Sequence, residues 1–258
     1  SAEDFNHEEQ RMLSTLYVQT AAEHRASVLQ TFKTATNLLP KAIEDASWNA
    51  LPNLASSNRD LAPAIIIDVD DTVLDNSPYE ARLIKFGQSY PSGWGDWCNE
   101  SQAKPLPGVL EFLLKAEQMG VKIFYVTNRK YEFEKGTLEN FKKFGIPIEG
   151  DEDSLLMRYE NGWDSNKTSR RELIAKNHRV IFQIGDNLGD FVDLSLSHQS
   201  PEKRVEVVTE FNDMWGKYWF MIEDPTYGDW EGALYKFNFD RSNQEIIQIR
   251  NKKLDEAR

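Results

Sequence analysis

The chain has 258 residues, of which 40% are hydrophobic, enough for one large domain with a sizeable core, so disorder is excluded as its overall state. Lysine and arginine number 30 against 42 aspartate and glutamate residues, a formal net charge of −12. This sign excludes a protein held to nucleic acid or anionic lipid by bulk electrostatics, and any phosphate must be met by local cations. The single cysteine, Cys98, excludes an internal disulfide framework and a thiolate-rich zinc site.

The N-terminal part of the chain has a helical pattern. Apolar residues between Leu13 and Leu39 recur at spacings of three and four, which predicts one long helix or two joined helices whose end Pro40 leaves undecided. Polar residues 56–60, followed by Pro63, predict a loop. We therefore predict a helical segment over residues 1–60 that packs on a core formed by residues 61–258.

The first ten residues are polar and acidic and contain no signal peptide, although a leader could have been removed before this numbering begins. No apolar run approaches the ~20 residues needed to cross a bilayer. The sequence thus predicts a soluble chain without a transmembrane segment.

Four short apolar runs are typical of strands buried on both faces: residues 64–69, 121–126, 179–184 and, more weakly, 218–222. Helical spacing follows Pro107 and ends before Gly120, and another helix ends before Gly145. Residues 242–245 have capping-box spacing at the start of a closing helix. Alternating strands and helices predict an α/β fold in which helices flank a parallel sheet.

Ligands of open parallel sheets bind beyond the carboxyl ends of the strands. The first run continues into Asp68, Asp70 and Asp71. The first two carboxylates lie two residues apart on an extended segment and point to the same side, so one could attack while the other handles a proton. An Asp-rich turn that caps a helix is the structural alternative, but three acids after a buried strand need a compensating cation.

Further polar groups follow the next two strands. Thr127 and Asn128 offer a hydroxyl and an amide to an oxyanion, with a helix N-cap as an equal alternative. Asp186 and Asp190 lie four residues apart among glycines, a spacing that suits a hard divalent ion; a solvated glycine turn is the alternative. Lys167 precedes the third strand, where a surface lysine at a helix start is the simpler interpretation.

The order of these residues along the chain resembles the order of the motifs in the haloacid dehalogenase (HAD) superfamily of phosphohydrolases. It is similar, more closely, to that of the class C nonspecific acid phosphatases, which are bacterial surface enzymes of lipoprotein type. The first signature of that class corresponds to residues 68–79 and the second to residues 181–191. Two departures are visible, Asp71 where Glu is usual and Phe182 where Leu or Met is usual, and they bear on substrate fit more than on activity. The resemblance implies a HAD-like core with a small helical cap or lid, which we place at residues 76–106.

The resemblance also implies a hydrolase that cleaves phosphomonoesters through an aspartyl-phosphate intermediate. Asp68 would be the nucleophile, and Asp70 the general acid that then activates water. Magnesium would be bound by the Asp68 carboxylate, the Asp70 main-chain carbonyl and Asp186, with Asp190 in or just behind that shell. The nonbridging phosphate oxygens would be held by Thr127, Asn128 and Lys167.

Aromatic residues gather in two loops, residues 86–97 and 227–230. Lid packing explains each aromatic residue singly, whereas in the family such aromatics sandwich a substrate base or ring. Tyr90 and Tyr227 match these places, with Trp94 as a third member. The implied substrates are aryl phosphates and 5′-nucleotides, as for a 5′-nucleotidase, and not nucleic acid polymers.

The resemblance places the protein in the bacterial envelope, as a periplasmic protein or outer-membrane lipoprotein, or among secreted proteins, and allows a homo-oligomer. Two alternatives stay open. One is a noncatalytic storage or binding relative, against which the intact Asp68 and Lys167 argue. The other is an added haem-docking or partner-docking role for the exposed Trp and Tyr loops. The 4 histidines are scattered and do not suggest a histidine acid phosphatase or a zinc site.

Overall fold

The structure is a computed structural model that describes residues 6–52, 59–148 and 153–257. Its centre is a parallel sheet of five strands in the order β3-β2-β1-β4-β5. The strands are β1 (Pro63–Ile67), β2 (Lys122–Lys130), β3 (Leu155–Arg158), β4 (Arg179–Gly185) and β5 (Trp219–Met221). The α/β prediction with a parallel sheet is therefore confirmed.

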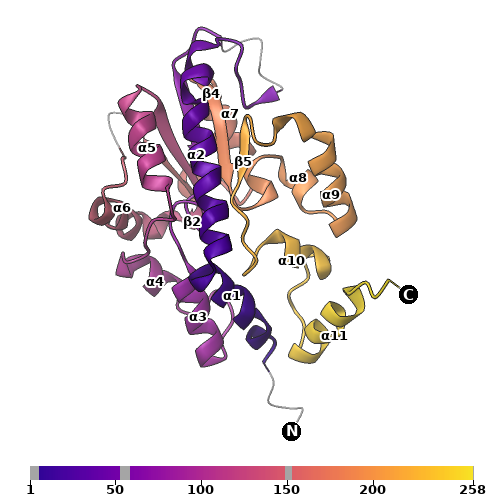
Figure 1. Ribbon diagram of the computed structural model, residues 1–258. Coiled ribbons are helices and arrows are strands. Elements are labelled where there is room, and N and C mark those ends of the chain that lie inside the picture. Colours follow the sequence, from indigo (N-terminus) through magenta and orange to yellow (C-terminus); the bar gives the residue numbers. More distant parts are fainter. Residues whose placement is uncertain (1–5, 53–58, 149–152, 258) are drawn as a thin grey trace.

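Helices cover both faces of the sheet, and the alternation along β1 shows how. Ile65 and Ile67 face a core shared with helices α2 (Ala22–Glu44) and α5 (Val109–Gln118). Ala64 and Ile66 face a second core shared with α7 (Thr168–Ala175) and α9 (Pro201–Glu210). Because both faces of each central strand are buried, the strands are apolar throughout instead of alternating with polar residues. Figure 1 shows α2 and α5 in front of the strands.

The N-terminal segment forms two joined helices, one of the two predicted arrangements. A 3₁₀ turn, η1 (His7–Arg11), leads into α1 (Met12–Thr20), and an extended Ala21 separates α1 from α2 (Ala22–Glu44). Pro40 does not end α2, which continues through it to Glu44. Of the predicted loop at residues 56–60, residues 56–58 lie outside the described part of the chain, and residues 59 and 60 form a turn.

The remaining helices connect the strands and continue the chain beyond β5. They are α3 (Ser77–Phe86), α4 (Trp94–Glu100), α5 (Val109–Gln118), α6 (Glu134–Phe144), α7 (Thr168–Ala175), α8 (Leu194–Ser197), α9 (Pro201–Glu210), α10 (Asp229–Leu234) and α11 (Asn243–Lys253). The predicted capping box at the start of α11 is present between Ser242 and Glu245. No helix of the described ranges combines the length and the hydropathy needed to cross a membrane.

The helices α3 and α4 lie in the segment between β1 and α5, within the range expected for a cap (Figure 1). In Figure 1, α3 and α4 lie in the lower part of the view, as do η1, α10 and α11, which come from the two ends of the chain. Segments from the N-terminus, from the stretch after β1 and from the stretch after β5 therefore meet on one side of the molecule. The predicted boundaries of the core and of the cap at residues 76–106 stay predictions.

Candidate active site

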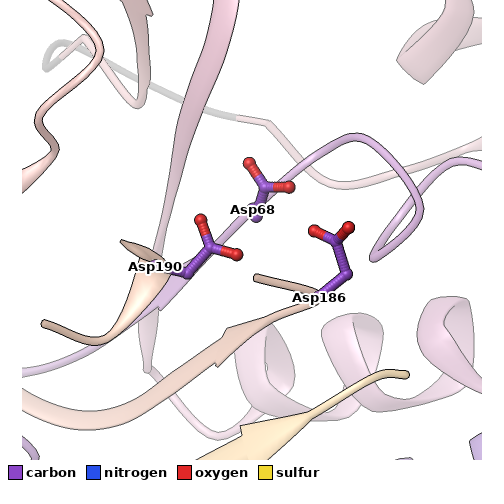
Figure 2. Close-up of side chains that lie close together, drawn as sticks. All are labelled: Asp68, Asp186 and Asp190. Carbon is purple, nitrogen blue, oxygen red and sulfur yellow. The ribbon is translucent and has the colours of Figure 1, made fainter. Parts of the chain in front are cut away.

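Three carboxylates converge where β1 and β4 end. Asp68 follows β1, and Asp186 and Asp190 follow β4, which pairs with β1 in parallel. Their carboxylates each offer an oxygen within 4.8 Å of the others, and Figure 2 shows the three groups gathered around one space. The convergence arises because the carboxyl ends of neighbouring parallel strands lie at the same edge of the sheet.

A buried lysine holds two of these carboxylates. The Nζ of Lys167 lies 2.5 Å from Oδ1 of Asp68 and 2.6 Å from Oδ1 of Asp190. Lys167 is the residue before α7 and is only 6% exposed. The interpretation of Lys167 as a surface lysine at a helix start is therefore wrong, because two charged partners compensate the cost of burying its ammonium group.

The cluster contains three acidic groups and one basic group. Burial, partly offset by Lys167, raises the pKa of Asp68 to about 7. Burial and the charges of Asp68 and Asp190 raise the pKa of Asp186 well above its ordinary value. Burial alone would lower the pKa of Lys167, but the two carboxylates raise it. Three carboxylates beside one ammonium group form an oxygen-rich set that fits a hard divalent cation.

Glycine allows Asp190 to reach its position. A Cβ on Gly185 would lie 2.3 Å from Oδ2 of Asp190, so a larger residue at the end of β4 would displace that carboxylate. The same Oδ2 accepts a hydrogen bond from the backbone N–H of Asn187 at 2.9 Å. This turn is therefore a packed support for Asp190, and the alternative of a solvated glycine turn is wrong.

Asp70 lies next to the cluster but has partners of its own. Its Oδ1 accepts hydrogen bonds from Nε of Arg129 at 2.9 Å and from Nδ2 of Asn76 at 2.7 Å, and Nη2 of Arg129 lies 2.8 Å away. The Nε1 of Trp97 in turn donates to Oδ1 of Asn76 at 2.8 Å. The described contacts of Asp70 therefore concentrate on one oxygen.

Arg129 is a residue to which the sequence assigned no role. It is 2% exposed, and its guanidinium lies 5.5 Å from the ring centre of Trp94. Burial would lower its pKa, but the nearby Asp70 raises it. The signal in the sequence was its position just after the polar pair at the end of the second strand, although only the fold shows that it faces Asp70.

The end of β2 differs from its prediction. The strand continues to Lys130 with a register shift after Thr127, so Thr127 and Asn128 are not a helix N-cap. The Thr127 hydroxyl accepts the backbone N–H of Arg129 at 3.0 Å. The Asn128 side chain accepts a hydrogen bond from Nη2 of Arg170 at 2.7 Å and donates to the Ser165 carbonyl at 3.0 Å. These contacts brace the loop, and the predicted phosphate contacts stay predictions.

The aromatic residues form two rims. The lid rim consists of Tyr90 and Trp94, whose ring centres are 6.1 Å apart, and Tyr90 is 62% exposed. The β5 rim is Tyr227, in the loop that follows β5. The Tyr227 hydroxyl donates to Oδ2 of Asp71 at 2.8 Å, and burial and the Asp71 charge raise the pKa of Tyr227 well above its ordinary value.

Asp71, one of the two departures from the class C signature, connects this rim to the first acidic motif. Its backbone is left-handed with a φ of 54°, and its Oδ1 accepts the backbone N–H of Asn76 at 2.9 Å. Burial and the charge of Asp224 raise the pKa of Asp71 well above its ordinary value. Asp71 also lines a cavity of about 830 Å³ with Asp75 and Trp97, but Asp68, Asp186 and Lys167 are not part of that lining.

The comparison with known proteins agrees with this geometry. The sequence profile of the family described as HAD superfamily, subfamily IIIB (acid phosphatase) matches residues 5–230. The chain therefore belongs to this family of HAD hydrolases, which confirms the predicted superfamily and class of enzyme.

Solved structures support the same assignment. The class C acid phosphatase from Bacillus anthracis has 34% sequence identity and a TM-score of 0.86, with 98% of this chain and 100% of that chain covered. The structure of the class C acid phosphatase from Bacillus anthracis with tungstate bound has 34% identity and a TM-score of 0.84, covering 97% of this chain and 99% of that chain. The fold and the class C resemblance are confirmed by these matches.

The curated relatives include a plant acid phosphatase and plant storage proteins. Acid phosphatase 1 of Solanum lycopersicum is 25% identical over 142 residues, which are 52% of this chain and 54% of the relative. Vegetative storage protein 1 of Arabidopsis thaliana is 24% identical over 161 residues, 59% of this chain and 57% of the relative. The chain thus spans little more than half the length of these plant proteins.

Proposed function

We propose that the protein is a Mg²⁺-dependent phosphomonoesterase that works through an aspartyl-phosphate intermediate. The convergence of Asp68, Asp186, Asp190 and Lys167 at the ends of β1 and β4 carries this proposal. The site combines a carboxylate nucleophile, an excess of oxygen ligands and one buried cation, the components that in-line phosphoryl transfer requires.

The residues divide the reaction into two displacements. An oxygen of Asp68 attacks phosphorus while the bond from phosphorus to the leaving oxygen breaks, and protonated Asp70 transfers its proton to that oxygen. The resulting carboxylate of Asp70 then takes a proton from water as the water oxygen attacks phosphorus, which releases phosphate and restores both side chains. The contacts of Arg129 and Asn76 with Oδ1 of Asp70 support this role, because they leave Oδ2 without a described hydrogen bond and so available for proton transfer.

The donor set fits a magnesium ion. Asp68 and Asp186 would hold it with the Asp70 carbonyl, and Asp190, which like Asp68 is bound to Lys167, would lie among these ligands or just behind them. When bound, the ion supplies positive charge to the phosphoryl oxygens. Lys167 supplies further positive charge beside Asp68, together with hydrogen-bond donors from Thr127 and Asn128. The site thereby provides the local cations that the net charge of −12 makes necessary.

The direct test is release of phosphate from a nitrophenyl ester by Asp68→Asn. We expect kcat to fall by several orders of magnitude, because an amide of nearly the same shape cannot form the covalent intermediate. Excess EDTA should abolish the wild-type activity and Mg²⁺ restore it, and Asp186→Asn should weaken that rescue. Asp213→Asn, which removes an exposed carboxylate outside the site, is the matched control.

Near-normal turnover of Asp68→Asn, or full wild-type activity in EDTA, would contradict the mechanism. Absence of phosphate release from every ester would instead favour a noncatalytic role, such as the one that the names of the storage-protein relatives suggest. Against that role stands the complete set of acidic and lysine side chains at the site. Magnesium dependence therefore separates the enzyme from a storage or docking protein on the same fold.

We further propose that aryl phosphates and 5′-nucleotides are preferred over aliphatic esters, with a ring placed between the two rims. Tyr90 is exposed and Tyr227 lies beside the acidic motif through its bond to Asp71, so aromatic faces border the site from two segments. Stacking worth roughly 1–3 kcal/mol per base corresponds to about a ten- to hundredfold preference over an aliphatic phosphate. Such stacking distinguishes little between purine bases.

Tyr227→Ala should raise KM for nucleoside monophosphates and nitrophenyl phosphate about tenfold, with little change for glycerol phosphate. Tyr227→Phe is the matched control, because it keeps the ring but removes the hydrogen bond to Asp71. Equal changes for aromatic and aliphatic esters in Tyr227→Ala would show that the ring is lid packing.

The predicted envelope or secreted location and a homo-oligomer complete the proposal as expectations from the class C resemblance.

A further inference from the structure

We propose that the N-terminal segment, through Asn6, Glu8 and Arg11, sets the spacing of the two aromatic rims and so determines the preference for aromatic substrates. We call these three residues the N-terminal clasp. The inference rests on the proposed stacking of a substrate ring between the rims. It assigns the clasp a positioning role, since none of its residues belongs to the acidic cluster.

One end of the clasp holds the loop that carries the lid rim. Oε1 of Glu8 accepts a hydrogen bond from the hydroxyl of Ser89 at 2.8 Å, and Nδ2 of Asn6 donates to the Gly87 carbonyl at 2.9 Å. Ser89 directly precedes Tyr90. Glu8 is 2% exposed although it lies in a polar stretch near the beginning of the chain, so its burial requires partners.

The other end holds the loop that carries the β5 rim. Nη1 of Arg11 donates to the carbonyl of Thr226 at 3.1 Å, and Nη2 donates to Oε2 of Glu231 at 2.8 Å. Thr226 directly precedes Tyr227, and Glu231 lies in α10 just after it. Arg11 therefore holds the β5 rim from both sides of Tyr227.

The two ends are joined by an ion pair within η1. Nε of Arg11 lies 2.9 Å from Oε2 of Glu8. Burial would raise the pKa of Glu8, but His7, Arg11 and Ser89 together lower it, so Glu8 stays charged at neutral pH. The side chains thus form a continuous polar connection from Ser89 through Glu8 and Arg11 to Thr226.

This connection matters because the described residues show no ring contact between Tyr90 and Tyr227, whose own contacts lead to Trp94 and Asp71. A stacked ring requires two aromatic faces at a set separation, and holding the faces there before binding lowers the entropic cost of ordering them. The clasp would therefore affect binding of the ring and leave the reaction at phosphorus unchanged.

The test compares KM for nitrophenyl phosphate and glycerol phosphate in Ser89→Ala, Glu8→Gln and Arg11→Met. Ser89→Ala removes one hydroxyl from an exposed loop residue and keeps the proposal testable if Arg11→Met fails to fold. Glu8→Gln retains an acceptor for Ser89, so it should raise KM for nitrophenyl phosphate less than Ser89→Ala does. Arg250→Met is the matched control, since Arg250 binds Glu231 and the His7 carbonyl but makes no hydrogen bond or ion pair with either rim in the described part of the chain.

We expect Ser89→Ala and Arg11→Met to raise KM for nitrophenyl phosphate about three- to tenfold, the equivalent of one or two lost hydrogen bonds. Their kcat, and both constants for glycerol phosphate, should stay within about twofold of wild type. Arg250→Met should leave the ratio of the two KM values unchanged. A rise in KM for the aromatic ester alone distinguishes a positioning role from a general loss of stability, which lowers activity on both esters alike.

If the ratio of KM for nitrophenyl phosphate to KM for glycerol phosphate changes in Tyr227→Ala but in neither Ser89→Ala nor Arg11→Met, the positioning role of the clasp is wrong and the proposed stacking stands. A ratio that changes in none of these variants, Tyr227→Ala included, would overturn both. Parallel losses on the two esters in Arg11→Met and Ser89→Ala would also overturn the clasp, because they would show a structural role only.

Discussion

Asp70 receives its hydrogen bonds on one carboxylate oxygen, and that asymmetry has a chemical consequence. Arg129 and Asn76 both reach Oδ1, and Nη1 of Arg129 is fixed on its other side by the Thr137 hydroxyl at 3.0 Å. A guanidinium held at both ends orients the carboxyl group more firmly than a single flexible partner. In the proposed mechanism this keeps Oδ2 directed to the leaving oxygen.

Arg129→Met should therefore lower kcat for glycerol phosphate by about ten- to hundredfold, a loss within the range attributed to general acid–base catalysis. The loss should be smaller for nitrophenyl phosphate, because nitrophenolate leaves without needing a full proton. KM should change little for the aliphatic ester. Steady-state kinetics on the two esters measure this difference.

The control for that measurement is Lys130→Met, which removes the neighbouring cation whose side chain is 46% exposed. Equal losses of kcat on both esters in Arg129→Met would mean that Arg129 supports the fold of the site in general and does not orient Asp70 for proton transfer.

Helix α4, which begins at Trp94, packs on α6 at a glycine. A Cβ on Gly136 would lie 2.6 Å from the Cys98 carbonyl oxygen and 2.9 Å from Cα of Asn99. The Ser101 hydroxyl also donates to the Gly136 carbonyl at 2.8 Å. Oδ1 of Asn99, 2.8 Å from that Cβ, could rotate aside, but the two backbone atoms cannot, so α4 itself must move.

Gly136→Ala should lower the free energy of unfolding by about 1–3 kcal/mol, as expected for overpacking. Alanine is favoured over glycine inside a helix by roughly 0.5–1 kcal/mol, so a net loss would show that packing outweighs helix propensity. Denaturant titration measures the change. Lys135→Ala, at a neighbouring position whose side chain is 90% exposed, should be neutral or slightly stabilising. A stabilised Gly136→Ala would mean that α4 is not held in this contact.

Acidic residues exceed basic ones across the chain, and the fold buries some of them outside the site. Glu80 in α3 is 4% exposed, and among the described residues its one ionic partner is Arg11, whose Nη1 lies 3.8 Å from Oε2. Burial, partly offset by Arg11, raises the pKa of Glu80 from 4.5 to about 8. The folded protein therefore binds this proton more tightly than the unfolded chain does.

Stability should consequently depend on pH in a defined direction. Protonated Glu80 makes its full contribution to the free energy of unfolding below its ordinary pKa. This contribution is lost as pH rises through about 8. Tm should fall between pH 5 and pH 8, by roughly 2–4 °C for each kcal/mol lost in a domain of this size. Calorimetry in EDTA should show a smaller fall for Glu80→Gln than for wild type or for the exposed-site control Glu111→Gln. An equal fall in all three proteins would assign the pH dependence to other groups.

The sequence by itself determined the α/β class and the place of the acidic cluster. The runs at 64–67, within the predicted strand 64–69, and at 179–184 are largely apolar on both faces, which only a covered strand tolerates. Asp68 follows the first run directly, and Asp186 follows the second after Gly185. Strand β3 was not predicted. Its Leu155–Arg158 run has four residues, too few for a period to be recognised, and pairing with β2 makes it a strand.

The tertiary structure alone decided which polar residues are buried and by what they are compensated. Arg129 meets Asp70 across 59 positions of the chain, and Tyr227 meets Asp71 across 156. Glu8, in a stretch that composition predicts to be polar, is buried because Arg11 and Ser89 compensate it. Hydrophobic periodicity is local and can be counted along a sequence, whereas the cost of burying a charge depends on partners that only the complete fold brings into contact.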